Sequence, residues 1–237
     1  MNKKQNACPL FDLYWENTNL NNKNIFNFIN NFANEEHDIM PIRYATNDIK
    51  LKYPDDRLFD VMKKRQSDRQ YQNYQISKKQ LSSLFSSFAQ VNNHRLLASA
   101  GAKYPIEVYA LCFNVQNLNN KIVYYNYLDN SLSIIGQCAS WDKLKYITGA
   151  GDMIEGSPSM MFIFVGFKDR VVSKYGERGG RFILIESGHY IQNLVLRVTY
   201  EKLKAVELGG IYDNDIKRLL GLENTNAIIT LGVICGK

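Results

Sequence analysis

Three side chains that could bind a phosphate lie in one short stretch, Arg65-Gln66-Ser67-Asp68-Arg69. Two guanidinium groups with a hydroxyl between them suit a phosphate, because arginine donates paired hydrogen bonds and serine adds one more donor. Arg65, Ser67 and Arg69 are therefore candidate phosphate ligands. The alternative is two exposed arginines at a solvated helix end, and this stretch alone does not decide between the two.

A second stretch, Ala98-Ser99-Ala100-Gly101-Ala102-Lys103-Tyr104-Pro105, consists mostly of small residues. Small residues let the backbone approach a flat ligand closely, and glycine adopts backbone angles that other residues avoid. Ser99, Ala100 and Gly101 are candidates for such a contact. The alternative is an ordinary loop that leads into a strand after Pro105.

A third stretch places Lys174 beside Tyr175, ahead of a helix that carries polar residues next to apolar ones. Gln192 and Asn193 lie on that helix, and buried amides need hydrogen-bond partners. A flavin ring edge would provide such partners, and so would a neighbouring helix at a subunit interface. His189 on the same helix is more simply interpreted as a buried structural histidine than as a catalyst.

Gly209 and Gly210 follow Leu208, where backbone N–H groups could approach a ligand; a helix C-cap is the alternative. The cysteines and histidines have no spacing typical of a metal site or a disulfide framework, so no metal ligand is assigned. A redox enzyme built this way would need an organic cofactor. The residues concerned are Cys8, Cys112, Cys138, Cys235, His37, His94 and His189.

The elements that must position these residues follow from the hydrophobic periodicity. Strands and helices in this order indicate an α+β sandwich. Residues 1–54 form an Asn-rich N-terminal arm with one small helix, and residues 55–237 form the main domain. Helices are predicted around Ile25–Phe32, over Arg57–Lys64, from Ser77, over 179–204 and from Asp213 to Gly221; strands are predicted over Ile106–Phe113, Met160–Phe167 and Ala227–Cys235, with a hairpin over Ile122–Ile134.

Composition and charge limit the class of protein. The 237 residues are 45% hydrophobic and 22% charged, which is typical of a globular chain. The net charge of +6 is spread along the sequence, so an anionic cofactor or an acidic peptide explains it as well as nucleic acid would, and no nucleic-acid partner is expected. No apolar run could cross a membrane and no signal segment opens the chain, so a cytoplasmic protein is expected.

The order of these stretches resembles the nitroreductase superfamily, and specifically its SagB-type dehydrogenase branch, the azoline oxidases of thiazole/oxazole-modified peptide biosynthesis. The resemblance covers about residues 57–236, and Leu13-Tyr14-Trp15-Glu16-Asn17-Thr18 is similar to the N-terminal region of that branch. It rests on Arg-x-Ser-x-Arg, Ser-Ala-Gly-Ala-x-Tyr-Pro-Ile-Glu-Val, Lys-Tyr-Gly-Glu-Arg-Gly-x-Arg, Glu-x-Gly-His-x-x-Gln-Asn-Leu and Gly-Gly, in that order.

The resemblance implies a nitroreductase-like FMN-binding sandwich with a central mixed sheet, in an intertwined homodimer that binds FMN at two interface sites. It assigns the phosphate and the pyrimidine edge to Arg65, Ser67 and Arg69, and a contact with the ring from the partner subunit to the Ser99–Gly101 segment. Gly209 and Gly210 would face the N5 side of the flavin. Gln192 and Asn193 would lie at the dimer core.

The same resemblance ties Lys174 and Tyr175 to catalysis. An azoline becomes an azole by losing a proton and a hydride. A lysine whose pKa is lowered by burial, or a tyrosinate stabilised by that lysine, would take the proton. FMN would accept the hydride and oxygen would reoxidise it. The implied partners are an azoline-containing precursor peptide and a cyclodehydratase complex.

Two other functions are open at this point: a generic NAD(P)H-dependent nitro or flavin reductase, and a non-catalytic scaffold subunit of a cyclodehydratase complex. The intact Lys174-Tyr175 pair favours the azoline oxidase over the reductase. The FMN motifs argue against the scaffold. Gly180 and Lys103 stand where many relatives carry a bulky residue and a leucine, so the ligand pocket is expected to differ.

Overall fold

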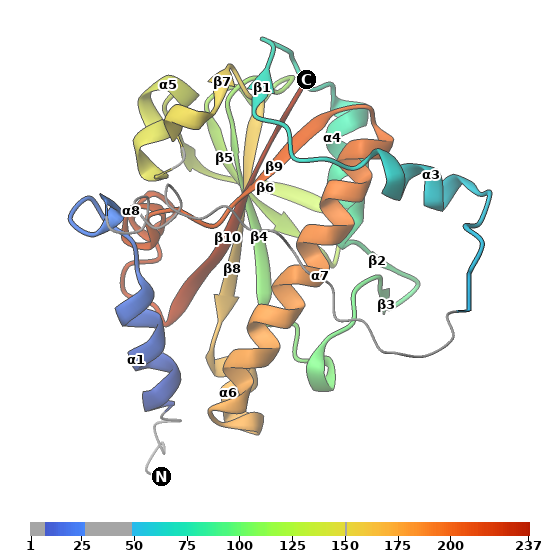
Figure 1. The fold of residues 1–237 in the computed structure, drawn as a ribbon. Helices are drawn as coiled ribbons and strands as arrows, with labels where there is room; N and C mark the ends of the chain where they lie inside the picture. The colour runs from blue at the N-terminus through green and yellow to red at the C-terminus, as the bar shows by residue number, and fades with distance from the viewer. Residues whose placement is uncertain (1–7, 27–48, 150) are drawn as a thin grey trace.

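The computed structural model describes residues 8–26, 49–149 and 151–237, and six strands form its central sheet (Figure 1). Their order is β6-β5-β4-β8-β10-β9, and neighbouring strands pair antiparallel. Parallel pairing enters at the margins, in the bridge from Ser67 to Ala205 and between two short strands, β1 and β7. The expected α+β fold with a mixed sheet is confirmed. The sheet consists of β4 (Ile106–Cys112), β5 (Lys121–Asn126), β6 (Ser131–Gln137), β8 (Met160–Phe167), β9 (Lys204–Leu208) and β10 (Ala227–Gly236).

Helices cover both faces of this sheet, because its central strands are apolar on both sides. Phe162 and Phe164 of β8 pack with residues of α4 (Lys78–Phe85) and α7 (Arg178–Tyr200), and Figure 1 shows α7 crossing that face. The alternate residues Met161 and Ile163 pack on the other face with α5 (Trp141–Leu144) and α8 (Asp213–Leu219). Each such fully buried side chain contributes roughly 1.5–3 kcal/mol of hydrophobic stabilisation.

The remaining elements are short and lie around the sheet. They connect the layers and carry several of the candidate site residues. They are α1 (Pro9–Thr18), α3 (Arg57–Lys64), α6 (Asp169–Tyr175), β1 (Gln70–Tyr71), β2 (Gln90–Val91), β3 (His94–Arg95), β7 (Glu155–Gly156) and the 3₁₀ turns η1 (Ser86–Phe88), η2 (Ala100–Ala102), η3 (Lys145–Ile147) and η4 (Gly151–Met153).

The helix starts that depend on local capping were predicted correctly. Asp56 accepts a hydrogen bond from the Phe59 amide at 2.8 Å, so α3 begins at Arg57 as predicted. Ser77 and Gln80 form a capping box at the start of α4. A side-chain oxygen at the N-cap satisfies an amide that has no partner within the helix, and this signal is readable in the sequence.

The long helix predicted over 179–204 begins within one residue of the predicted start but ends earlier than predicted, and the helix before it was not predicted. A separate helix, α6, precedes it and ends at Gly176, which has a φ of +53°. At the other end α7 stops at Tyr200, Lys202 adopts a φ of +58°, and β9 begins at Lys204. Gly209 and Gly210 therefore follow a strand, and the alternative that they form a helix C-cap is wrong. The short C-terminal helix begins at Asp213, with Tyr212 at the N-cap and no side-chain cap.

The N-terminal arm is only partly described. Of the predicted amphipathic stretch, Phe28, Ile29 and Phe32 lie outside the described residues. Pro9–Thr18 forms α1, a helix that was not predicted, and Phe11 is buried against the main domain. The division into residues 1–54 and 55–237 stays a prediction. Within the described ranges no helix has the length and apolarity that a membrane crossing would require.

An acidic side chain is buried in the first half of α7. Glu186 is only 2% exposed, and neither of its carboxylate oxygens has a hydrogen-bond partner among the described residues. Burial raises its pKa to about 7, against the opposing effects of the Ser99 hydroxyl, the Arg95 guanidinium and the Ala100 amide. Arg95 is itself buried and donates to the Tyr190 hydroxyl at 2.9 Å.

We predict that Glu186→Gln changes the pH dependence of stability. Between about pH 4.5, where an ordinary glutamic acid titrates, and about pH 7, the folded chain holds a proton on Glu186 that the unfolded chain has lost. The stability from this proton is present at the acid end of that range and is lost as pH rises through 7. Relative to the variant, the free energy of unfolding of the wild type should fall by roughly 2–3 kcal/mol between pH 4.5 and 8.

Urea unfolding of both proteins at several pH values measures this difference. Asp213, whose pKa burial also raises to about 7, is present in both proteins, so its contribution cancels. Parallel stability curves would show that Glu186 does not retain a proton in the folded chain.

Candidate functional site

The second and third candidate stretches meet within one chain. Gly101 lies against the end of α6, and a Cβ atom on it would stand 2.4 Å from the Tyr175 hydroxyl and 2.8 Å from Lys174 Nζ. Gly101 also has a φ of +58°, a region that favours glycine. Any side chain at this position would displace the Lys-Tyr pair. The resemblance assigned the two stretches to one site, and the geometry brings Gly101, Lys174 and Tyr175 together.

The loop around Gly101 is held by contacts within the chain. The Ser99 hydroxyl accepts a hydrogen bond from the Tyr104 amide at 2.7 Å, and Arg170 donates to the Tyr104 carbonyl at 2.8 Å. Behind the loop, the Arg95 guanidinium lies over the Tyr104 ring, 4.3 Å from its centre. These contacts hold the Ser99–Gly101 segment on the side of Arg95 and Tyr104, and Tyr175 lies against Gly101.

The Lys-Tyr pair itself is accessible. Lys174 is exposed and Tyr175 is half-buried, with its ring edge-on to Phe182 at 4.9 Å between centres. The expected burial of Lys174 is therefore not found within a single chain. The Lys174 ammonium lies 5.3 Å from the centre of the Tyr175 ring, so the two side chains stay side by side at the end of α6.

The phosphate candidates lie along the edge strand β9. Ser67 forms a parallel bridge with Ala205, and the Asp68 amide donates to the Ala205 carbonyl at 2.9 Å. Arg65, Ser67 and Arg69 are all exposed, and no described residue pairs with either guanidinium. Free charged donors held on an ordered backbone suit a phosphate dianion.

A cavity of about 420 Å³ opens between α7 and strands β9 and β10. This volume lies in the range of ligand pockets. Gln192 lines it, and Gly209, just beyond the end of β9, lies close to Leu231 on its wall, since a Cβ there would be 3.9 Å from Leu231 Cδ1. The lining residues are Leu184, Ser187, Gly188, Ile191, Gln192, Glu207, Thr230 and Leu231.

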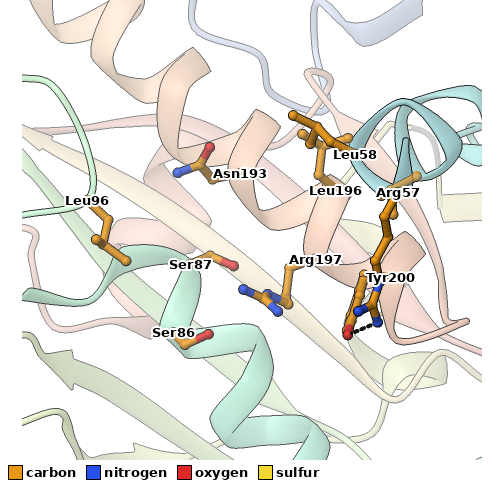
Figure 2. Close-up of a pocket in the computed structure, with 10 residues that line it drawn as sticks. Arg57, Leu58, Ser86, Ser87, Leu96, Asn193, Leu196, Arg197 and Tyr200 are labelled. Carbon is orange, nitrogen blue, oxygen red and sulfur yellow. Dashed lines mark hydrogen bonds between the residues drawn. The ribbon is translucent and has the colours of Figure 1, made fainter. Parts of the chain in front are cut away.

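Gln192 and Asn193 are not brought together. Asn193 points away from that cavity and lines another of about 520 Å³, between α3, η1 and the second half of α7. Figure 2 shows Asn193 on this side with Ser87 and Leu96, and with Arg57 hydrogen-bonded to Tyr200. Successive helix residues point about 100° apart, so the pair could not line one pocket unless that pocket wrapped around α7.

The two groups of candidates lie at opposite ends of the sheet. Ala205, beside the phosphate candidates, pairs with Cys235, which pairs with Met160 at the start of β8. Lys174 and Tyr175 follow the other end of β8, at Phe167. An eight-residue strand spans roughly 23 Å, at about 3.3 Å per residue. Within one chain, the phosphate candidates and the Lys174-Tyr175 pair are therefore too far apart to contact the same part of a ligand.

The residues present fit FMN. A phosphate would find free donors at Arg65, Ser67 and Arg69, and a flat ring would find a cavity lined by a glycine, Gly188, whose Cβ position is open. His189, expected in the core, is instead exposed. Sequence reasoning missed Glu207, Thr230 and Leu231 as lining residues. Glu207 lies on β9, a strand that was not predicted, and Thr230 and Leu231 lie on β10, whose predicted strand did not indicate which side chains face a cavity.

Comparisons with known proteins agree with this fold. The nitroreductase family matches residues 62–237. A candidate nitroreductase of Methanocaldococcus jannaschii is 29% identical over 177 residues, which are 70% of this chain and 85% of that protein. The microcin B17-processing protein McbC of Escherichia coli is 28% identical over 150 residues, which are 61% of this chain and 55% of that protein.

Solved structures show the same fold. The E. coli microcin synthetase McbBCD complex with truncated pro-MccB17 bound matches with a TM-score of 0.68 and 20% identity, over 94% of this chain and 86% of that chain. A candidate nitroreductase from Desulfovibrio desulfuricans in complex with FMN matches with a TM-score of 0.56 and 14% identity, over 77% and 87% of the two chains. The motifs, the fold and the family match agree: this chain belongs to the nitroreductase family.

Proposed function

We propose that this chain is an FMN-dependent dehydrogenase that oxidises peptide thiazolines or oxazolines to thiazoles or oxazoles. The observation that carries the proposal is the approach of Gly101 to the Lys174-Tyr175 pair, which places a potential base beside the loop assigned to the flavin ring. The similarity to McbC, a microcin-processing protein, supports peptide modification as the context. By the same similarity, the partners are the azoline-bearing precursor peptide and a cyclodehydratase complex.

The chemistry divides between cofactor and protein. FMN, when bound, supplies the acceptor for the hydride. The azoline carbon bears an acidic proton, because the adjacent C=N and carbonyl groups stabilise the resulting charge. Tyr175, with Lys174 beside it, removes this proton, and a peptide can reach the exposed Lys174 and the half-buried Tyr175. Loss of one proton and one hydride makes the ring aromatic.

A homodimer completes each site in this proposal. Because β8 separates the phosphate candidates from the Lys-Tyr pair, the Arg65–Arg69 segment, Gln192, Gly209 and Gly210 of one protomer act with Ser99–Gly101 of its partner. Large exposed apolar side chains on α3, α7 and the intervening loops support a partner surface. They are Leu58, Met62, Leu96, Leu184 and Ile185.

FMN is expected to co-purify with the wild type, and Arg65→Ala or Arg69→Ala should weaken its binding by about tenfold to a hundredfold. Each change removes a charge-assisted hydrogen bond worth about 1.5–3 kcal/mol. Lys64→Ala is the matched control, since it removes a neighbouring charge outside the motif. Flavin absorbance after dialysis gives the measurement. Colourless wild-type protein that takes up no added FMN would rule out the flavoenzyme.

The protein should sediment as a dimer that buries about 2,000 Å² or more. Ile185→Asp, on the exposed face of α7, should shift it toward monomer and release FMN together, because one chain carries only half of each site. Leu128→Asp, in the turn between β5 and β6, is the control and should leave both unchanged. Analytical ultracentrifugation with detection at the flavin wavelength tests this, and a flavin-bearing monomer would contradict it.

Lys174→Ala and Tyr175→Phe should keep FMN and fold but lose turnover by about 10²–10⁴-fold, as is typical for removal of a general base. The assay is the loss of two hydrogen masses from an azoline-bearing peptide, without added NADH, because the substrate is the reductant. Full activity in both variants would remove the pair from the mechanism. Flavin reduction by NADH with no azole formed would favour the generic reductase instead.

A further inference from the structure

The helix α1 lies directly against the turn that follows Lys174 and Tyr175. The Glu177 carboxylate accepts hydrogen bonds from the backbone amides of Leu10 and Phe11, each at 3.0 Å. These are amides of the first turn of α1, whose N-cap residue, Cys8, provides no side-chain cap. Glu177 therefore caps α1 from a residue distant in sequence, with its negative charge at the positive end of the helix dipole.

A second contact depends on a missing side chain. Phe11 is buried, and a Cβ atom on Gly180 would stand 2.4 Å from Cδ2 of its ring and 2.6 Å from two further ring carbons. Alanine is preferred to glycine within a helix, so glycine in the first turn of α7 has a local cost. The ring of Phe11 occupies the space that any side chain at this position would need.

A third contact fixes the other side of the turn. Lys168, at the start of α6, forms an ion pair with Asp12 of α1. Lys168 and Glu177 flank α6, so α1 contacts the residues on both sides of the helix that ends in Lys174 and Tyr175. Between them, Gly176 has a positive φ and an open Cβ position. Its backbone is hydrogen-bonded to Val172 and Gly179, both close in sequence, so the contacts of α1 are the ones that tie this turn to a distant segment.

We propose that α1 holds the Gly176 turn in place and thereby positions Lys174 and Tyr175, with Phe11 and Glu177 as positioning residues. The functional part rests on the proposed azoline oxidation. The helix α1 is then part of the site through the turn that it holds. Displacement of a reacting group by about 1 Å can cost about 10²-fold in rate, so a helix that only fixes a turn can control turnover.

The test compares Phe11→Ala and Glu177→Ala with the matched control Leu13→Ala, an exposed position on the same helix. Hydrogen exchange of the 169–180 segment should accelerate at least tenfold in the first two and not in the control. The kcat for azole formation should fall about tenfold to a hundredfold. FMN content should stay unchanged, because the phosphate candidates lie at the other end of the sheet. Glu177→Gln, which keeps an acceptor oxygen, should recover part of the kcat.

A double-mutant cycle tests the contact between Phe11 and Gly180. Gly180→Ala alone should loosen the segment, whereas in the Phe11→Ala background it should change exchange little, because the ring is gone. Unchanged exchange in Phe11→Ala and Glu177→Ala, or loosened exchange with wild-type kcat, overturns the proposal. Should the wild type form no azole, the proposed function fails, while the exchange data still decide whether α1 holds the turn.

Discussion

The register of the central sheet is the constraint on which the site depends. Strand β8 pairs with β10 over its whole length, so its two ends carry different parts of the chemistry. The donors for a phosphate lie beside the end at Met160, and the Lys174-Tyr175 pair follows the end at Phe167. Side chains cannot bridge this length, so a ligand that needs both groups needs two chains. This separation is the reason for including a dimer in the proposed function, and the exposed apolar side chains of α7 support that choice.

Glycines allow close packing between segments near the Phe167 end of β8. Gly101 allows Tyr175 and Lys174 to lie against the Ser99 loop, Gly179 allows α7 to pack on the backbone of α6, and Gly180 accommodates Phe11. At Gly101 and Gly180 the absent side chain is replaced by a group from a segment distant in sequence. Gly180, which was expected to alter the ligand pocket, instead leaves a space that Phe11 of α1 fills.

The parts of the fold governed by local rules could be predicted from the sequence. Asp56 and Ser77 mark helix starts because their side chains cap nearby amides, and the apolar run Met160–Phe167 is a strand buried on both faces. Strand β9 was missed because five residues beside a long helix continue its apolar pattern. The opposite directions of Gln192 and Asn193, and the partnership of Phe11 with Gly180, depend on tertiary packing, which adjacency in sequence does not reveal.

The Ser99–Gly101 loop lies between a buried and an exposed environment, and this contrast suits the proposed chemistry. Behind it, Glu186 and Arg95 lie in the interior, and burial raises the pKa of Glu186 to about 7, so near neutral pH the carboxyl is substantially protonated and its desolvation cost is limited. In front of it, Lys174 is open to solvent. A small aromatic substrate gains most from an enclosed pocket, whereas an azoline carried on a peptide must enter with its flanking residues attached. A loop supported from within and accessible from outside therefore fits a peptide substrate better than a small free one.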